Sequence, residues 1–227
     1  MRISVIVPFL DEALALPATL RHLERECAAY GDVEIIAVDG GSTDASRSVL
    51  ARHRAVRVIT AHRGRARQMN AAAAMATGDV LLFLHADTWL PEGALAAIAW
   101  AARSAGFTYG GFQHRFSGGD WRLRLISALH NYRCRKALTF YGDQAMFVRQ
   151  SAFAAIGGFP DTAVEDIAIS QRLKTLARPV VLPQSVTTSS RKFERMGIWT
   201  SFGRVLAILL CLRTGRKPPS AFFADIR

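Results

Sequence analysis

Asp87 has a sequence position that suits contact with a metal ion or a charged ligand. It follows residues 80–84, five consecutive apolar residues of the kind found in strands buried on both faces. Pro91 then marks the start of a helix. In open α/β sheets, ligands bind beyond the carboxyl ends of the strands, which is where this carboxylate is expected. A single aspartate there often only caps a turn, so the residues that accompany it decide its role.

Other charged residues follow the remaining predicted strands in the same way. Glu12 lies shortly after the first strand, Asp39 directly follows the second, and Arg63 and Arg65 follow the third. Because parallel strands end at one edge of a sheet, these side chains are expected to lie near Asp87. Carboxylates suit a nucleoside and a divalent metal, and arginines suit phosphates. The combination predicts a site for a nucleotide diphosphate.

Alternating strands and helices must position these residues. The apolar periodicity predicts strands at 3–7, 33–38, 56–59 and 80–84, and helices at 14–30, 42–53, 65–77 and 91–103. Ser42 is the expected cap of the second helix. This alternation predicts an α/β fold with a mostly parallel, doubly wound central sheet flanked by helices.

The second half of the chain is less regular and is expected to complete the site over the carboxyl edge of the sheet. It should contain one or two strands within 107–116 with a bend at Gly110 and Gly111, a basic helix at 121–136, a strand at 144–148, a helix at 165–177, a strand at 180–182 and an apolar helix at 198–213. We therefore expect one domain at 1–195, with a nucleotide-binding half (1–105) and an acceptor half (106–195). A C-terminal amphipathic helix and tail (196–227) would follow.

Composition favours a globular protein with an anionic partner. Hydrophobic residues make up 50% of the 227 residues and charged residues 21%, which argues against disorder. The formal net charge is +11, which suits nucleotide phosphates, nucleic acid or an anionic membrane surface. Nucleic acid is the least favoured of these, because no nucleic-acid-binding motif appears and aromatic residues are not interleaved with the basic ones.

The cysteines and the apolar runs predict a cytoplasmic protein. Cys27, Cys134 and Cys211 form no CxxC pair, which fits a reducing compartment rather than a disulfide framework or a zinc site. Glu12 and its acidic neighbour interrupt the N-terminal apolar run, so no signal peptide is expected. Residues 205–212 are far fewer than the roughly 20 that span a bilayer.

Several motifs occur in an order that resembles the family 2 glycosyltransferases. They are residues 7–12 (VPFLDE), 38–44 (VDGGSTD), 85–87 (HAD) and 165–166 (ED). Members of that family are GT-A-fold enzymes that transfer a sugar from a nucleotide diphosphate with inversion, and the resemblance covers residues 2–195. Residues 63–70, 84–88 and 141–144 further resemble one bacterial subgroup, found near radical-SAM/selenodomain genes.

The resemblance implies a role for each matching residue. Asp87 would bind Mg²⁺ or Mn²⁺, and Asp166 would be the catalytic base. Asp143, Gln144 and Glu165 would face the sugar or the acceptor. The residues implied in donor binding are Pro8, Glu12, Asp39, Arg63, Arg65, Gln68, Asn70, His85, Arg191 and Lys192.

Two positions depart from the family pattern. His85 stands where most members have the first aspartate of an Asp-x-Asp motif, which leaves Asp87 as the one firm metal carboxylate. His85 is either a metal ligand or a hydrogen-bonded packing residue. Gly40 replaces the second aspartate often found after the second strand, which leaves the base specificity open.

Other functions remain as alternatives. A sugar-nucleotide nucleotidyltransferase uses a similar sheet and metal, but usually has a glycine-rich basic loop after the first strand, where residues 8–12 are acidic and free of glycine. A non-enzymatic protein that binds nucleic acid or membranes is suggested only by the charge.

Two segments leave membrane contact open. The helix at 121–136 presents its basic residues either to solvent or to an anionic acceptor or membrane, with Trp121, Leu125 and Leu129 as its buried face. The apolar helix at 197–213 precedes the basic residues Arg213, Arg216 and Lys217. It suits peripheral contact with the inner face of an anionic membrane, or equally a docking or dimer interface. The acceptor is accordingly either a lipid or a small molecule.

Overall fold

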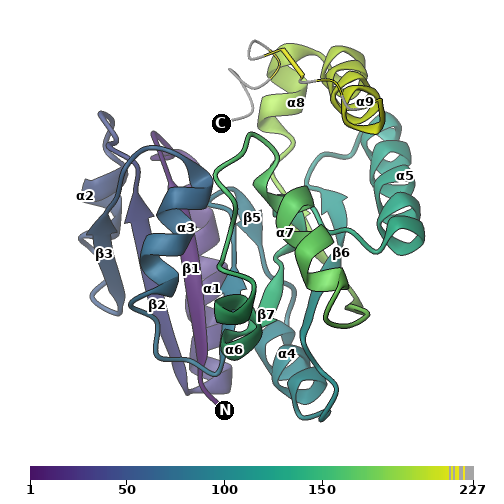
Figure 1. Cartoon of the computed structure of the whole chain (residues 1–227). Helices are drawn as coiled ribbons and strands as arrows, with labels where there is room; N and C mark the ends of the chain where they lie inside the picture. The colour runs from purple at the N-terminus through teal and green to yellow at the C-terminus, as the bar shows by residue number, and fades with distance from the viewer. Residues whose placement is uncertain (215, 217, 220–221, 223–227) are drawn as a thin grey trace.

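The computed structural model describes residues 1–214, 216, 218–219 and 222. Within these residues, eight strands form one mixed sheet in the order β3-β2-β1-β4-β7-β6-β8-β5, flanked by helices (Figure 1). The predicted α/β architecture with helices on the sheet is confirmed.

The first half of the sheet is parallel, as predicted. It consists of β1 (Ile3–Phe9), β2 (Val33–Asp39), β3 (Val56–Thr60) and β4 (Val80–Phe83). All residues of β1 and β4 are buried, because each strand is covered on both faces. The four strands therefore end at one edge, which brings the acid-bearing turns after β1, β2 and β4 together.

The second half of the sheet is mixed and contains a strand that the sequence did not reveal. It consists of β7 (Phe147–Arg149), β6 (Tyr109–Phe116), β8 (Val180–Thr188) and β5 (Thr88–Trp89). β7 runs antiparallel to β4 and β6, while β8 is parallel to β6 and antiparallel to β5. β8 extends well past the predicted residues 180–182, because it pairs along most of β6.

Helices cover both faces of the sheet. One hydrophobic core lies under α1 (Leu16–Tyr30), α2 (Ser46–Leu50) and α4 (Ala94–Ala102). The other lies under α3 (Arg65–Ala73), α6 (Gln150–Ala155) and α7 (Glu165–Lys174), which face the viewer in Figure 1. Past the carboxyl edge of the parallel strands lie α8 (Arg191–Met196) and α9 (Ile198–Arg213), and α5 (Trp121–Ala137) packs against β6 and α9.

The helix predicted from Ser42 is much shorter than expected. α2 spans only Ser46–Leu50, and the Ser42 hydroxyl accepts a hydrogen bond from the Asp11 amide at 3.0 Å instead of capping a helix. In return, the Asp11 carboxylate accepts from the Thr43 amide at 2.7 Å. These bonds hold the turns after β1 and β2 against each other, so Ser42 has no role at the helix N-terminus.

The prediction for the buried face of α5 is wrong. Trp121, Leu125 and Leu129 are 59%, 43% and 46% exposed, and the helix packs through Leu123 and Ile126 instead. Apolar residues occur on both sides of this helix, so spacing alone could not identify the side that meets the domain.

The bend predicted at Gly110 and Gly111 is also wrong, because both residues continue β6 as a strand. Both glycines are needed for packing. A Cβ on Gly110 would lie 2.6 Å from the ring of Phe147, and one on Gly111 would lie 2.5 Å from the ring of Phe140. Bare backbone at this point lets the two aromatic rings pack directly on the strand.

We expect Gly110→Ala to lower the free energy of unfolding by about 1–3 kcal/mol or more, because the added methyl overpacks the core. Gly106→Ala is the matched control, since a Cβ there meets no heavy atom within 4 Å. The control should change the free energy by less than about 0.5 kcal/mol. Urea unfolding followed by circular dichroism measures both, and equal values would contradict the packing role of Gly110.

Candidate active site

A cavity of about 850 Å³ opens at the carboxyl edge of the parallel strands. Its walls come from the turns after β1 and β4, the start of α3, and parts of α5, α7, α8 and α9. The predicted site residues that line it are Pro8, Glu12, Arg63, Arg65, Gln68, His85, Asp87, Asp143, Asp166 and Lys192. Residues from both halves of the sequence thus meet around one space.

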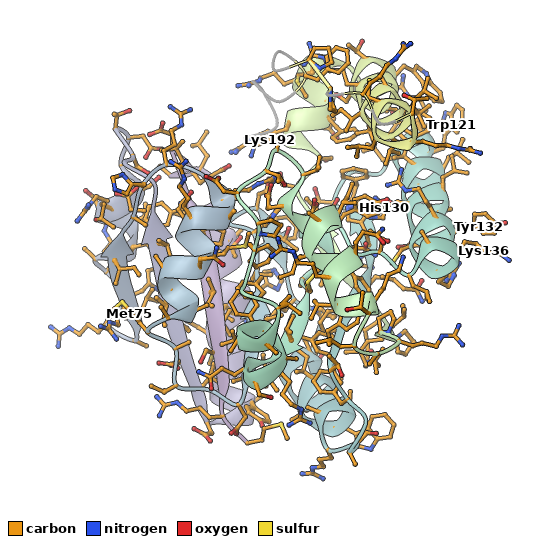
Figure 2. The ribbon with its side chains drawn as sticks, in the orientation of Figure 1. Met75, Trp121, His130, Tyr132, Lys136 and Lys192 are labelled. Carbon is orange, nitrogen blue, oxygen red and sulfur yellow. The ribbon has the colours of Figure 1, made fainter. Side chains whose placement is uncertain are left out.

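Lys192 joins two of the predicted acidic residues. Its Nζ lies 2.6 Å from Glu12 Oε1 and 3.4 Å from Asp87 Oδ2. Arg191 approaches the other Glu12 oxygen at 3.4 Å. Burial alone would lower the pKa of Lys192, but the Asp87 and Glu12 carboxylates raise it above its ordinary value. A protonated amine therefore lies beside Glu12 and Asp87 in the cavity; Figure 2 labels this side chain of α8.

The backbone of Asp87 is fixed by the second half of the sheet. Its carbonyl accepts a hydrogen bond from the Ser189 amide at 2.9 Å, and the next residue, Thr88, pairs with Thr188 across β5 and β8. Because α8 begins two residues after Ser189, this pairing also sets the distance between Asp87 and Lys192.

His85 lies in the same turn, surrounded by charged groups. Burial and the Arg65 guanidinium lower its pKa to about 4, against the opposite effect of the carboxylates of Asp87, Asp143 and Asp166. The ring is therefore neutral at pH 7. It packs directly against the backbone of Gly142, where a Cβ would overlap it.

The adjacent acids Glu165 and Asp166 point to different partners. Glu165 is 3% exposed and forms an ion pair with Arg65, whose Nε lies 2.6 Å from its Oε1. Asp166 lines the cavity, and its two oxygens accept hydrogen bonds from the amides of Gly142 and Ile167, each at 2.8 Å. Two backbone amides thus orient the Asp166 carboxylate at the cavity wall.

Arg63 and Arg65 flank the start of α3 beside the cavity. Between them, Gly64 adopts φ +133°, which lets the chain turn sharply from β3 into the helix. Arg63 and Arg65 are therefore placed at the same edge as the turns after β1 and β4.

Five of the predicted residues lie outside the lining of the cavity within the part of the chain that the structure describes. They are Asp39, Asn70, Gln144, Glu165 and Arg191. Asp39 is 1% exposed, and its carboxylate accepts hydrogen bonds from the amides of Gly41 and Ser42 at 3.0 and 2.7 Å. Burial alone would raise its pKa, but these bonds and Arg47 lower it. This carboxylate shapes the turn after β2.

The three predicted amide side chains bind backbone groups around the site. Gln68 donates to the carbonyls of Phe9 and Val38 at 2.9 and 2.8 Å, which joins the ends of β1 and β2. Asn70 binds both the amide and the carbonyl of Phe159. Gln144 accepts from the Tyr141 amide and donates to the Phe112 carbonyl, each at 3.1 Å.

The structure places two histidines that the sequence analysis did not select beside Asp143. His114 Nε2 and His130 Nε2 lie 3.4 and 3.6 Å from the Asp143 oxygens. Burial alone would raise the pKa of Asp143, but the neighbouring imidazoles have the larger effect, so the pKa lies below its ordinary value. Burial also lowers the pKa of His114 to about 4. Single histidines on a strand and a helix carry no spacing signal, so their meeting could not be foreseen.

Comparison with known proteins identifies the family. The family model described as "Glycosyl transferase family 2" matches residues 4–157. A "PGL/p-HBAD biosynthesis glycosyltransferase" of Mycobacterium tuberculosis is 33% identical over 171 residues, covering 69% of this chain and 62% of that protein. An "undecaprenyl-phosphate 4-deoxy-4-formamido-L-arabinose transferase" of Enterobacter is 28% identical over 153 residues, with 62% and 46% covered. The chain thus spans about three fifths or less of the length of these relatives.

Solved structures of glycosyltransferases share the fold. The mannosyltransferase PcManGT of Pyrobaculum calidifontis, in complex with GDP-Man and Mn²⁺, superposes with a TM-score of 0.70 at 20% identity and covers 99% of this chain and 67% of that one. TarS 1–349 of S. aureus, in complex with UDP-GlcNAc, gives 0.68 at 18% identity, with 83% and 58% covered. These likenesses confirm the predicted GT-A-like architecture. With the family model matching most of its length, the chain belongs to glycosyl transferase family 2.

Proposed function

We propose that this protein transfers a glycosyl group from a nucleotide-diphosphate sugar to an acceptor hydroxyl, with inversion at the anomeric carbon. The observation that carries the proposal is the cavity in which Asp87, Lys192 and Asp166 meet. It offers a metal carboxylate, a diphosphate-binding cation and a base. Structural relatives bound to GDP-Man or UDP-GlcNAc support a donor of this chemical class.

Cationic side chains suit the donor end to a leaving diphosphate. Lys192 and Arg191 come from α8, Arg63 comes from the turn before α3, and Arg65 is the first residue of α3. Negative charge builds up on the diphosphate as the glycosidic bond breaks, and preorganised cations stabilise that charge. Before donor binds, Glu12 pairs with both Lys192 and Arg191, so the diphosphate would compete with this carboxylate for them.

Asp87 fits a role in holding Mg²⁺ or Mn²⁺. The carboxylate lines the cavity, and its Oδ2 lies 3.4 Å from Lys192 Nζ. An oxygen that could bind a metal ion therefore already lies beside a positive charge. One protein carboxylate is enough for such an ion, which commonly completes its shell with substrate phosphates and water. The Mn²⁺ of the Pyrobaculum relative supports this assignment. The bound ion would neutralise charge on the diphosphate.

Asp166 is the proposed base. An acceptor hydroxyl becomes a good nucleophile when a positioned base removes its proton, which accelerates a reaction by roughly 10²–10⁴-fold. The Gly142 and Ile167 amides hold the carboxylate in place at the cavity wall. Asp143 lines the same wall and would contact the sugar or the acceptor.

A nucleotidyltransferase is the weaker alternative. The loop after β1 carries Glu12, which binds cations of α8, and contains no glycine that would cradle a triphosphate. Membership of family 2 favours transfer of the sugar. Within the family, the motif around Arg63–Asn70 and the Tyr141–Gln144 turn support the subgroup found near radical-SAM/selenodomain genes.

We further propose peripheral contact with an anionic membrane on the cytoplasmic side. α5 and α9 expose large apolar side chains next to basic ones; those above 40% exposure are Trp121, Leu125, Leu129, Tyr132, Trp199, Leu206 and Leu210. Of the predicted basic cluster, Lys217 lies outside the described residues. Among the described helices, none is long and apolar enough to cross a membrane. The Enterobacter relative is named for undecaprenyl phosphate, a lipid, which supports a lipid acceptor here.

Asp166→Asn should keep donor binding and lower transfer at least about 100-fold, because the amide has the same size but cannot take a proton. Release of nucleoside diphosphate from radiolabelled UDP-GlcNAc and GDP-Man measures turnover, and calorimetry with UDP and GDP measures binding. Glu165→Gln is the companion variant. Normal turnover in Asp166→Asn together with an inactive Glu165→Gln would assign the base to Glu165.

Asp87→Asn should remove the dependence of nucleoside diphosphate binding on Mn²⁺, because the carboxylate is the expected metal ligand. Titration calorimetry with Mn²⁺ and with a chelator would measure this dependence. Asp79→Asn is the control, since its carboxylate binds the Arg2 amide at the opposite edge of the sheet. If nucleoside diphosphate binding depends on Mn²⁺ in Asp87→Asn as it does in the wild type, Asp87 shapes the turn and does not bind the metal.

Replacing Trp121 and Trp199 together by serine should reduce flotation with anionic vesicles at low salt by several-fold, because these exposed rings would enter the lipid interface. The two rings lie 6.3 Å apart on α5 and α9. Trp100→Ser is the control, since this ring is 73% exposed on α4. If the wild-type protein does not float, α9 is a docking helix and not a lipid contact.

A further inference from the structure

Three side chains that could bind a metal converge on the acceptor side of the cavity. His114 comes from β6, His130 from α5 and Asp143 from the 3₁₀ turn η1 (Gly142–Gln144). One ligand atom from each lies within 4.8 Å of the other two. Figure 2 shows His130 on the side of α5 that faces the domain.

Hydrogen bonding within the protein does not account for this cluster. His114 is 1% exposed, yet neither of its ring nitrogens has a hydrogen-bond partner among the described residues. The same holds for His130 Nε2 and Asp143 Oδ1. The separations of 3.4 and 3.6 Å exceed the 2.7–3.2 Å typical of a hydrogen bond. Buried polar atoms without partners are costly, so another species is expected to satisfy them.

The separations suit a shared metal ion. In a tetrahedral site with bonds of about 2.0–2.1 Å, neighbouring ligand atoms lie roughly 3.3 Å apart. The distances from His114 Nε2 to Asp143 Oδ2 and from His130 Nε2 to Asp143 Oδ1 are within a few tenths of an ångström of that value, and they run to different oxygens of the carboxylate. One ligand atom of each residue lies within 4.8 Å of the other two, so the three would draw slightly closer around an ion. Two imidazoles and one carboxylate favour Zn²⁺ or a neighbouring transition metal, whereas Mg²⁺ prefers oxygen ligands only.

Neighbouring amide side chains fix the positions of the three ligands. Asn131, next to His130 on α5, binds both the amide and the carbonyl of His114, each at 2.8 Å. Gln144, next to Asp143, donates to the carbonyl of Phe112 on the same strand at 3.1 Å. α5 and η1 are thereby each tied to β6 beside a ligand. Supports of this kind hold ligands in place before the metal binds.

We propose that His114, His130 and Asp143 form a binding site for a transition metal ion of the Zn²⁺ type, separate from the site at Asp87. His130 and Asp143 line the cavity, whereas His114 lies behind them, so the open coordination position would face the cavity. Three protein ligands with one open position are typical of zinc sites that contact substrate. If the proposed transferase function holds, that position would take an oxygen of the acceptor.

Metal titration of the full chain tests the site without nucleotide or acceptor. After treatment with a chelator, the wild-type protein should bind one Co²⁺ with the visible absorption of a four-coordinate nitrogen and oxygen site. Zn²⁺ should displace it, and excess Mg²⁺ should not. Zn²⁺ should also raise the melting temperature by mass action.

Variants locate the ion. His130→Gln and Asp143→Asn, each checked for folding by circular dichroism, should reduce Co²⁺ affinity at least about 10-fold. Asp87→Asn and His62→Gln, in which the replaced histidine is exposed, should bind Co²⁺ as the wild type does. A thiolate-to-cobalt band would place the ion at a cysteine and overturn the proposal.

Two other results would also overturn the proposal. Absence of Co²⁺ binding in the wild-type protein would mean that water fills the cluster. If Asp87→Asn loses as much Co²⁺ affinity as His130→Gln and Asp143→Asn, then Asp87 and the cluster belong to a single metal site. Because every readout is made without donor, loss of transferase activity alone would leave this assignment standing.

Discussion

The contact of the Lys192 ammonium with Glu12 and Asp87 determines how the rest of the site is arranged. Two carboxylates that converge on one cavity repel each other, and the repulsion is strong where water is partly excluded. The Lys192 ammonium offsets this repulsion, because its Nζ lies 2.6 Å from Glu12 Oε1 and 3.4 Å from Asp87 Oδ2. The turns after β1 and β4 can therefore lie close together, and charge pairs hold the end of the cavity around Glu12 and Asp87.

The parallel half of the sheet could be predicted from the sequence, because each of its strands is marked by a local run of apolar residues. Continuous apolar runs predict buried strands, and parallel pairing then brings Glu12 and Asp87 to one edge. The second half depends on long-range pairing. β5 is only Thr88–Trp89, and its strand character comes from pairing with β8, about a hundred residues later. The meeting of His114 with Asp143 has the same origin, because β6 and η1 come together only in the folded chain.

Several residues of the recognised motifs hydrogen-bond to the backbone around the cavity, whether or not they also line it. The Gln68 amide spans the ends of β1 and β2, Asn70 holds the loop at Phe159, and Gln144 ties η1 to β6. A motif match identifies residues that the site requires but does not separate those that touch a ligand from those that hold the loops. Only hydrogen-bond partners make that distinction, which is why these amides could not be assigned from spacing.

The long separation between Glu12 and its cation also has a consequence during synthesis. Glu12 precedes Lys192 by 180 residues, so at about 5–20 residues per second it waits roughly 10–40 s on the ribosome for its partner. The emerging chain can pair β1, β2 and β3 in that time, but the acidic turns gain their counterion only when α8 appears. The acidic turns after β1 and β4 are therefore synthesised well before the cation that pairs with them.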